Sequence, residues 1–171
     1  MAFRAPFSLV AVVRPKYDQG IFRAGLTKNI CNGLKQAGIQ VEAYDKVEPN
    51  PTDISMAEGA QLVKEAQIDA IVAIGGGSSM DCAKGIRILA SNLAPIGLYE
   101  GFEPVKRKQT VLVCVPTTSG TSSELTNVCI ISDTEQERKY IVAGKNVGAD
   151  YAFVDPDMMD GLPARVTADT G

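Results

Sequence analysis

Short apolar runs alternate with amphipathic helical patterns along most of the chain, and this alternation restricts the fold more than any other feature. The runs are rich in valine and isoleucine without a two-residue period, which is typical of strands buried on both faces. Strands are predicted at residues 8–13, 39–44, 70–74 and 111–115, and helices at about 21–37, 55–67 and 78–92. The expected fold class is therefore α/β, a parallel sheet with helices on both faces.

The pattern changes after residue 126. Two apolar runs, 127–132 and 139–144, flank the polar stretch DTEQER and predict a β-hairpin. A further strand is expected at 151–155, and a helix begins near residue 164. The length of 171 residues suits one core of ordinary size, so residues 1–171 are interpreted as a single domain.

Two local signals mark helix ends. Gly38 stands where a glycine C-cap of the first helix belongs. Ser55 and Glu58 fit a capping box, which predicts that the second helix opens at Ser55.

Composition argues against several functions. The net charge is −3, so binding to nucleic acid or to an anionic membrane surface is not expected. No apolar run approaches the ~20 residues that a membrane-spanning helix needs. The sequence has no histidine, and its four cysteines are scattered without a C-x-x-C pair, so no zinc site is expected. Such thiols fit a reducing cytoplasm, which is the expected location.

Three consecutive glycines, Gly75 to Gly77, join the third predicted strand to the helix that follows. Parallel sheets bind ligands beyond the carboxyl ends of their strands. Glycine lets the backbone approach a ligand, and the amides of the first helical turn, from Ser78 onward, lack partners within the helix. These features predict an anion site with a diphosphate as its natural ligand. Alternatively, the glycines serve only a tight strand-to-helix turn.

The charged residues after the glycines have more than one interpretation. Asp81 lies in the first turns of the predicted helix, where an acid interacts favourably with the helix dipole. Lys84 follows one turn later, and it either pairs with Asp81 or reaches a phosphate.

A second polar stretch, PTTSGTSSELT at 116–126, follows the fourth predicted strand. Its hydroxyls, among them Thr117, Thr118 and Thr121, are able to donate to phosphate or ribose oxygens. Thr121 and Glu124 also match a capping box for a short helix, which is compatible with ligand contacts from the other threonines. Since both polar loops follow neighbouring strands, they predict a cleft at one edge of the sheet.

Four motifs, in this order, resemble the iron-containing alcohol dehydrogenases. They are PNPT at 49–52, IGGGSSMDCAKGI at 74–86, PTTSGTSSELT at 116–126 and DPDMMDGLP at 155–163. The resemblance is nearest to the lactaldehyde reductase, or propanediol oxidoreductase, members, and it is strongest over residues 40–171. It implies a Rossmann-like domain that binds NAD or NADP, which the family follows with a helical domain holding ferrous iron.

The resemblance also implies which residues bind the cofactor. The diphosphate would rest on Gly76, Gly77 and Ser78, and Asp81 would lie toward the nicotinamide. Other residues would line the cofactor or lie near it: Asn50, Thr117, Thr118, Thr121, Thr126 and Lys139.

The same resemblance gives an interpretation of the missing histidines. In the family, one aspartate and three histidines bind the iron, and the first of these ligands follow a Thr-Gly pair like Thr170-Gly171. The resemblance therefore implies a fragment that ends before the helical domain, with no catalytic and no metal-binding residue of its own.

The implied function is hydride transfer between a nicotinamide and a short-chain alcohol or aldehyde, with the isolated chain inactive. The family also implies a possible homodimer. From the residues alone, a non-catalytic module for nucleotides or sugar phosphates remains an alternative, because the same two loops would serve it. Arg14 is expected at the surface, with contact to the 2′-phosphate of NADP as the alternative.

Overall fold

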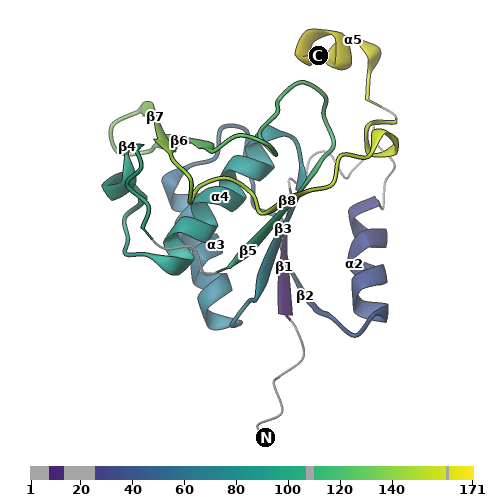
Figure 1. The fold of residues 1–171 in the computed structure, drawn as a ribbon, viewed down its shortest axis with the longest axis horizontal. Coiled ribbons are helices and arrows are strands. Elements are labelled where there is room, and N and C mark those ends of the chain that lie inside the picture. Colours follow the sequence, from purple (N-terminus) through teal and green to yellow (C-terminus); the bar gives the residue numbers. More distant parts are fainter. Residues whose placement is uncertain (1–7, 14–25, 107–109, 161) are drawn as a thin grey trace, which may run out of the picture.

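A computed structural model describes residues 8–13, 26–106, 110–160 and 162–171 (Figure 1). Its main sheet has five strands in the order β2–β1–β3–β5–β8, and each neighbouring pair in the described residues is parallel. The strands are β1 (Ser8–Val13), β2 (Gln40–Tyr44), β3 (Ala70–Gly75), β5 (Val111–Pro116) and β8 (Tyr151–Ala152). The predicted parallel sheet is therefore confirmed, with the expected strands within one residue of their predicted starts.

Helices cover both faces of this sheet, as predicted (Figure 1). On one face lie α3 (Asp53–Glu65) and α4 (Gly77–Ser91), and the main hydrophobic core fills the space beneath them. On the other face lies α2 (Leu26–Gln36), where Ile30 and Leu34 pack toward Val72 and Ile74 of β3. The part of the predicted first helix before Leu26 lies outside the described residues.

The strands differ in burial. In β3 every residue from Ala70 to Ile74 is buried, as the apolar run predicts. In β5 buried residues alternate with more exposed ones, and Val111 is exposed. Residues near β8, such as Phe153, are also exposed, because α2 packs over the β2–β1–β3 side of the sheet. The prediction of burial on both faces is therefore correct for β3 and wrong for β5 and for the edge strand β2, in which only Tyr44 is buried.

A second, smaller sheet has the order β4–β7–β6 and packs beside α4 (Figure 1). Its strands are β4 (Gly101–Phe102), which follows the 3₁₀ turn η1 (Ile96–Tyr99), β6 (Val128–Asp133) and β7 (Arg138–Ala143). β6 and β7 are antiparallel, which confirms the predicted hairpin. Cys129, Ile131, Tyr140 and Val142 alternate toward the core, so the inner face of this sheet joins the main core.

The helix ends show one prediction confirmed and one wrong. Gly38 has a positive φ of 82°, and the amides of Gly38 and Ile39 donate to the carbonyls of Lys35 and Leu34. This pattern is the expected glycine cap. The second helix, however, begins at Asp53, two residues earlier than predicted, because Thr52 is its N-cap and exchanges hydrogen bonds with Ser55. Ser55 is thus the last residue of the capping box, at the N3 position, rather than the first.

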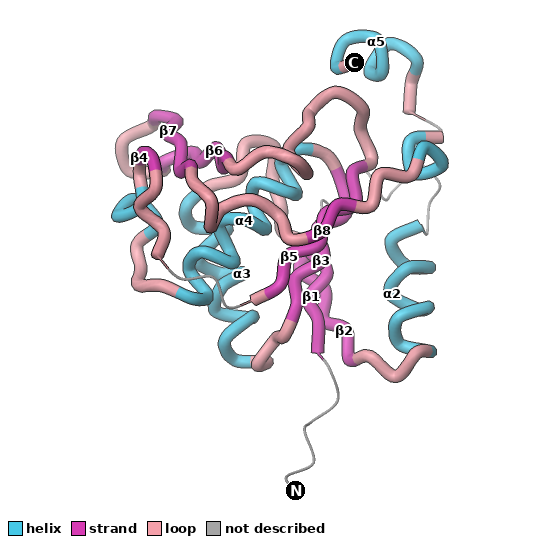
Figure 2. Tube along the Cα trace, viewed as in Figure 1, coloured by secondary structure: helices cyan, strands magenta, loops and turns pink. Residues whose placement is uncertain are grey.

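The chain ends in two short helical turns, η2 (Pro156–Met159) and α5 (Ala164–Thr170). Figure 2 shows α5 projecting from the body, next to the loop that follows β5. Gly120 of that loop has a φ of 84°, and a Cβ on it would collide with the Thr170 carbonyl oxygen. No helix among the described residues is long and apolar enough to cross a membrane.

Three of the four cysteines, Cys82, Cys114 and Cys129, are fully buried thiols. Burial raises the thiol pKa of Cys82 to about 12 and that of Cys114 to about 11, and it raises the pKa of Cys129 well above its usual value. Only the thiolate reacts with iodoacetamide, so these groups remain unreactive at mildly alkaline pH. We expect intact-mass measurement to show label on the half-buried Cys31 alone in the native chain, and on all four cysteines after unfolding. Native labelling of Cys82 or Cys129 would contradict this core.

Candidate functional site

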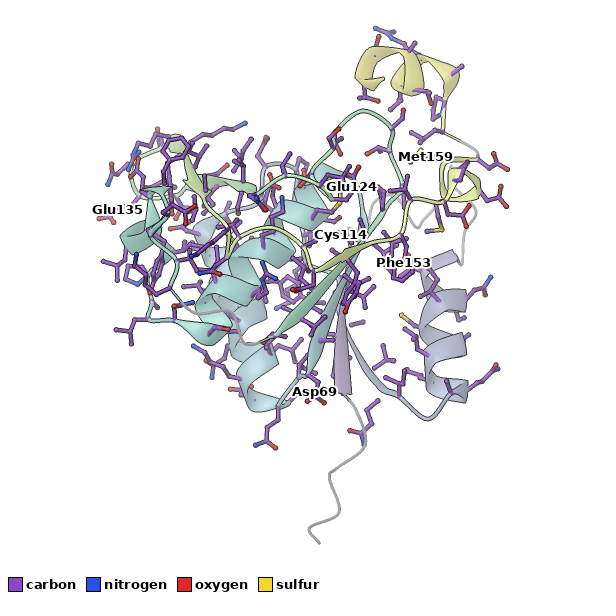
Figure 3. The ribbon with its side chains drawn as sticks, viewed as in Figure 1. Asp69, Cys114, Glu124, Glu135, Phe153 and Met159 are labelled. Atoms are coloured by element: carbon purple, nitrogen blue, oxygen red, sulfur yellow. The ribbon has the colours of Figure 1, made fainter. Side chains whose placement is uncertain are left out.

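The strand order places a switch point at β1 and β3. The chain moves from β1 to β2 on one side and then returns across β1 to β3 on the other. At such a point the connections leave the sheet in opposite directions, which opens a crevice at the carboxyl ends of the strands. Figure 3 marks the two edges, with Asp69 at the amino end of β3 and Glu124 near the opposite, carboxyl edge. Both polar loops singled out in the sequence lie at the carboxyl edge.

The glycine loop (residues 75–78) needs Gly75 and Gly76 for different reasons. Gly75 has a φ of 150°, and a Cβ there would collide with the Ser79 side chain. Gly76 is the N-cap of α4 and gives no side-chain cap, so the first amides of the helix are left without one. A Cβ on Gly76 would lie 3.0 Å from Thr118 Oγ1. The helix begins at Gly77, one residue before the predicted start.

The hydroxyl loop (residues 117–126) lies directly against the glycine loop. The Thr117 amide donates to the Gly75 carbonyl at 2.9 Å, which extends the pairing of β3 with β5. Thr118 faces Gly76, and Thr121 lies 3.5 Å from the position of a Cβ on Gly77. The structure thus brings together the predicted residues Gly76, Gly77, Ser78, Thr117, Thr118 and Thr121.

Several hydroxyls around this junction have no hydrogen-bond partner. Among the described residues, Ser79 Oγ, Thr118 Oγ1 and Ser119 Oγ are buried and unpartnered. A buried hydroxyl without a partner costs free energy, so Thr118 Oγ1, which faces Gly76 beside the uncapped amides of α4, fits an anionic ligand. Ser79 and Ser119 were not among the predicted site residues, although each stands next to one in the sequence.

Asp81 and Thr126 belong to a partly buried network instead. The Asp81 carboxylate accepts hydrogen bonds from Ser123 Oγ at 2.6 Å and from the Ile130 amide at 3.2 Å, and it lies 3.6 Å from Lys84 Nζ. Thr126 Oγ1 accepts a hydrogen bond from Lys84 at 3.2 Å. Of the alternatives for Lys84, the structure supports pairing with Asp81, because a fully buried side chain does not reach a phosphate in the crevice. A cofactor contact from Asp81 or Thr126 remains a prediction.

Asn50 and Lys139 form an exposed pair. Lys139 Nζ donates to Asn50 Oδ1 at 2.7 Å, and Asn50 has a positive φ of 56°. β6 connects this pair to the rest of the site, since the Ser132 amide donates to the Pro51 carbonyl while the Ile130 amide donates to Asp81. The two residues are therefore neighbours, as their predicted roles require, and their contact with a cofactor remains a prediction.

The predicted capping box of Thr121 and Glu124 is not formed. Residues 123–125 make a turn, in which the amides of Leu125 and Thr126 both bond to the Ser122 carbonyl. One carboxylate oxygen of Glu124, Oε2, is buried without a partner. A positive φ at Gly120 and at Ser122 breaks the helical path before a turn of helix is completed.

The donor set for a metal is a separate matter. Within the described ranges, no group of three histidine, cysteine, aspartate or glutamate side chains is placed to hold a metal ion. The described residues therefore do not fit the iron of the resemblance, and no step of a reaction is assigned to it in this chain. Arg14, named for the 2′-phosphate alternative, lies outside the described residues.

Comparison with known proteins decides the family. The model of the iron-containing alcohol dehydrogenase family matches residues 10–156. The chain belongs to the iron-containing alcohol dehydrogenase family. The resemblance carried by the four motifs is thereby confirmed, and so is the Rossmann-like α/β fold class.

Three relatives illustrate the match. Choline dehydrogenase of Bacillus subtilis strain 168 is 40% identical over 157 residues, covering 90% of this chain and 39% of that protein. NAD-dependent methanol dehydrogenase of Bacillus methanolicus is 35% identical over 154 residues, covering 90% of this chain and 40% of that protein. The crystal structure of a 1,3-propanediol oxidoreductase superimposes with a TM-score of 0.89 at 34% identity, covering 96% of this chain and 42% of that chain. The chain thus spans about two-fifths of the length of these members of the family.

Proposed function

We propose that residues 1–171 form a dinucleotide-binding domain that holds NAD(H) or NADP(H) at the carboxyl edge of the main sheet. The observation that carries this proposal is the uncapped start of α4, with the unpartnered hydroxyl of Thr118 facing Gly76 beside it. A diphosphate would supply the acceptors that these groups lack, and the helix dipole favours its negative charge. The NAD dependence named for the methanol dehydrogenase relative also supports this ligand.

Each residue has a role in this proposal. The backbone of Gly76, Gly77 and Ser78 binds the diphosphate through its amides, which small residues leave accessible. Thr117, Thr118 and Thr121 donate hydroxyl hydrogen bonds to phosphate or ribose oxygens. The pairing of β3 with β5 places them at the carboxyl edge of these two strands. The remaining proposed contacts are those of Asn50, Asp81, Thr126 and Lys139.

We propose further that the whole protein is an alcohol dehydrogenase or aldehyde reductase. The nicotinamide, when bound, supplies a hydride acceptor or donor for a short-chain alcohol or aldehyde. The contribution of the present residues is to bind the coenzyme and fix its orientation. Because the described residues offer no donor set for a metal, the chain alone is expected to bind coenzyme without turnover. A cytoplasmic location and a homodimer remain predictions.

Titration calorimetry of the chain with NADH, NADPH and ADP-ribose tests the binding proposal. We expect saturable binding of at least one nicotinamide coenzyme, with ADP-ribose retaining part of the affinity because it carries the same diphosphate. An NADH-formation assay with an alcohol, NAD⁺ and ferrous iron is expected to stay at background in the same preparation.

Two results would change the proposal. If none of the three compounds gives binding heat with a folded chain, the dinucleotide site is wrong. If ADP-ribose and simple sugar phosphates bind as tightly as NADH, the non-catalytic nucleotide or sugar-phosphate module is the better function.

A further inference from the structure

Lys84 is a fully buried cation in the middle of α4, about two turns after the glycine loop. Its ammonium group donates to Ser123 Oγ at 3.0 Å, to Thr126 Oγ1 at 3.2 Å and to the Val128 carbonyl at 2.6 Å. A buried ammonium is tolerated only when its donors find acceptors, and here the three acceptors match its three N–H groups. The side chain of Lys84 thus connects α4 to a segment 39 to 44 residues away in the sequence, from Ser123 to Val128.

The acceptors of Lys84 lie at one end of the hydroxyl loop. The other end of that loop is held at β3, through the Thr117 amide and the Gly75 carbonyl. Between these two attachments are the unpartnered hydroxyls of Thr118 and Ser119, and Gly120 with its positive φ. The hydrogen bonds of Lys84 therefore attach the second end of the hydroxyl loop to α4.

Ser123 extends this network toward the crevice. Its hydroxyl accepts from Lys84 and donates to Asp81 Oδ1 at 2.6 Å, so a single side chain connects the cation, the loop and the carboxylate. Asp81 also faces Lys84 at 3.6 Å, which balances the buried charge. No donor of Lys84 is directed at the crevice, because three acceptors on the loop and on β6 already occupy them.

We propose that Lys84 is a positioning residue, whose buried ammonium holds the hydroxyl loop against the glycine loop in the conformation that receives the dinucleotide. This inference rests on the proposed function. Lys84 does not contact the ligand, and it acts through Ser123 and Thr126.

The test compares Lys84→Met with Arg87→Met in the full chain. Arg87 is a matched control, since it is an equally buried cation one turn further along α4 and contacts a different loop, at Asn146, Val147 and Gly148. Both variants are measured at low temperature, after circular dichroism has established that each one is folded. The readouts are the Kd for NADH and the rate of amide hydrogen exchange in the absence of ligand.

We expect Lys84→Met to weaken NADH binding by about tenfold, the effect of losing hydrogen bonds from a charged donor. Amide exchange should accelerate in residues 118–126 while β3 stays protected. Arg87→Met should accelerate exchange in residues 144–150 and leave the Kd within about twofold of the wild type. The localised exchange separates a positioning role from a general loss of stability.

Several outcomes would overturn the inference. It is wrong if Lys84→Met binds NADH like the wild type, or if Arg87→Met weakens binding to the same extent. If Lys84→Met does not fold, Ser123→Ala decides, because it leaves the cation buried and removes one acceptor. It should weaken binding by about threefold and loosen the same segment, and wild-type values for both would refute the role of Lys84. Failure of the wild-type chain to bind NADH is a different result, which refutes the proposed function itself.

Discussion

Replacing Gly76 with valine is expected to weaken NADH binding by about 100-fold, which is roughly 2.7 kcal/mol. A Cβ at this position would lie only 3.0 Å from Thr118 Oγ1, and the two methyl groups of valine would fill the space in front of the first amides of α4. Gly76 has a φ of −83°, which valine adopts without strain. The variant should therefore fold normally, and the loss should reflect the obstructed approach of the diphosphate.

The control for this variant is Gly33→Val. Gly33 lies in α2, and a Cβ there would have no heavy atom within 4 Å, so the same chemical change meets open space. Titration calorimetry should give wild-type affinity for Gly33→Val and little or no binding for Gly76→Val. Undiminished NADH affinity in a folded Gly76→Val chain would mean that the diphosphate lies elsewhere.

Replacing Asp150 with alanine is expected to lower the free energy of unfolding by about 3 kcal/mol, the cost of leaving the buried Arg87 charge without its only carboxylate partner among the described residues. Arg87 is buried, and its NH1 donates to Asp150 Oδ2 at 2.9 Å. The same oxygen accepts from the Leu112 amide at 2.9 Å. Burial lowers the pKa of Arg87, and the Asp150 carboxylate opposes that shift, so removing the carboxylate removes the compensation. For a domain of this size the change corresponds to a decrease of about 6–12 °C in Tm.

An exposed pair of the same chemistry provides the comparison. Arg138 and Glu100 form two hydrogen bonds of 2.7 Å, and both side chains are more than two-fifths exposed. Solvent screens such a pair, so Glu100→Ala should change the Tm little. Thermal denaturation followed by circular dichroism measures both variants. Equal decreases in Tm for Asp150→Ala and Glu100→Ala would show that the burial of Arg87 does not make its ion pair more stabilising than the exposed pair.

Much of the main fold was predictable because apolar residues recur with different periods in strands and in helices. The apolar run of β3 and the glycines after it predict a strand end and a helix start, and each lies within one residue of its observed position. The hairpin of β6 and β7 was predictable for a similar reason, since two apolar runs flank a short polar turn. The proximity of the glycine loop and the hydroxyl loop followed from the shared carboxyl edge of neighbouring parallel strands.

Other features depend on contacts that a local pattern does not contain. Ser55 and Glu58 matched a capping box, yet Thr52 competes for the same role and forms the box with Ser55. The acceptors of Lys84 are 39 or more residues away, so only the folded chain shows where its donors go. The exposed positions of β5 depend on how far α2 reaches across the sheet, which the strand's own composition does not reveal.

The contact between Gly120 and the Thr170 carbonyl leaves no room for a side chain at position 120. Any larger residue there would have to displace either the tip of the hydroxyl loop or the end of α5. Because α5 has no buried residue, it offers the smaller resistance to such a displacement.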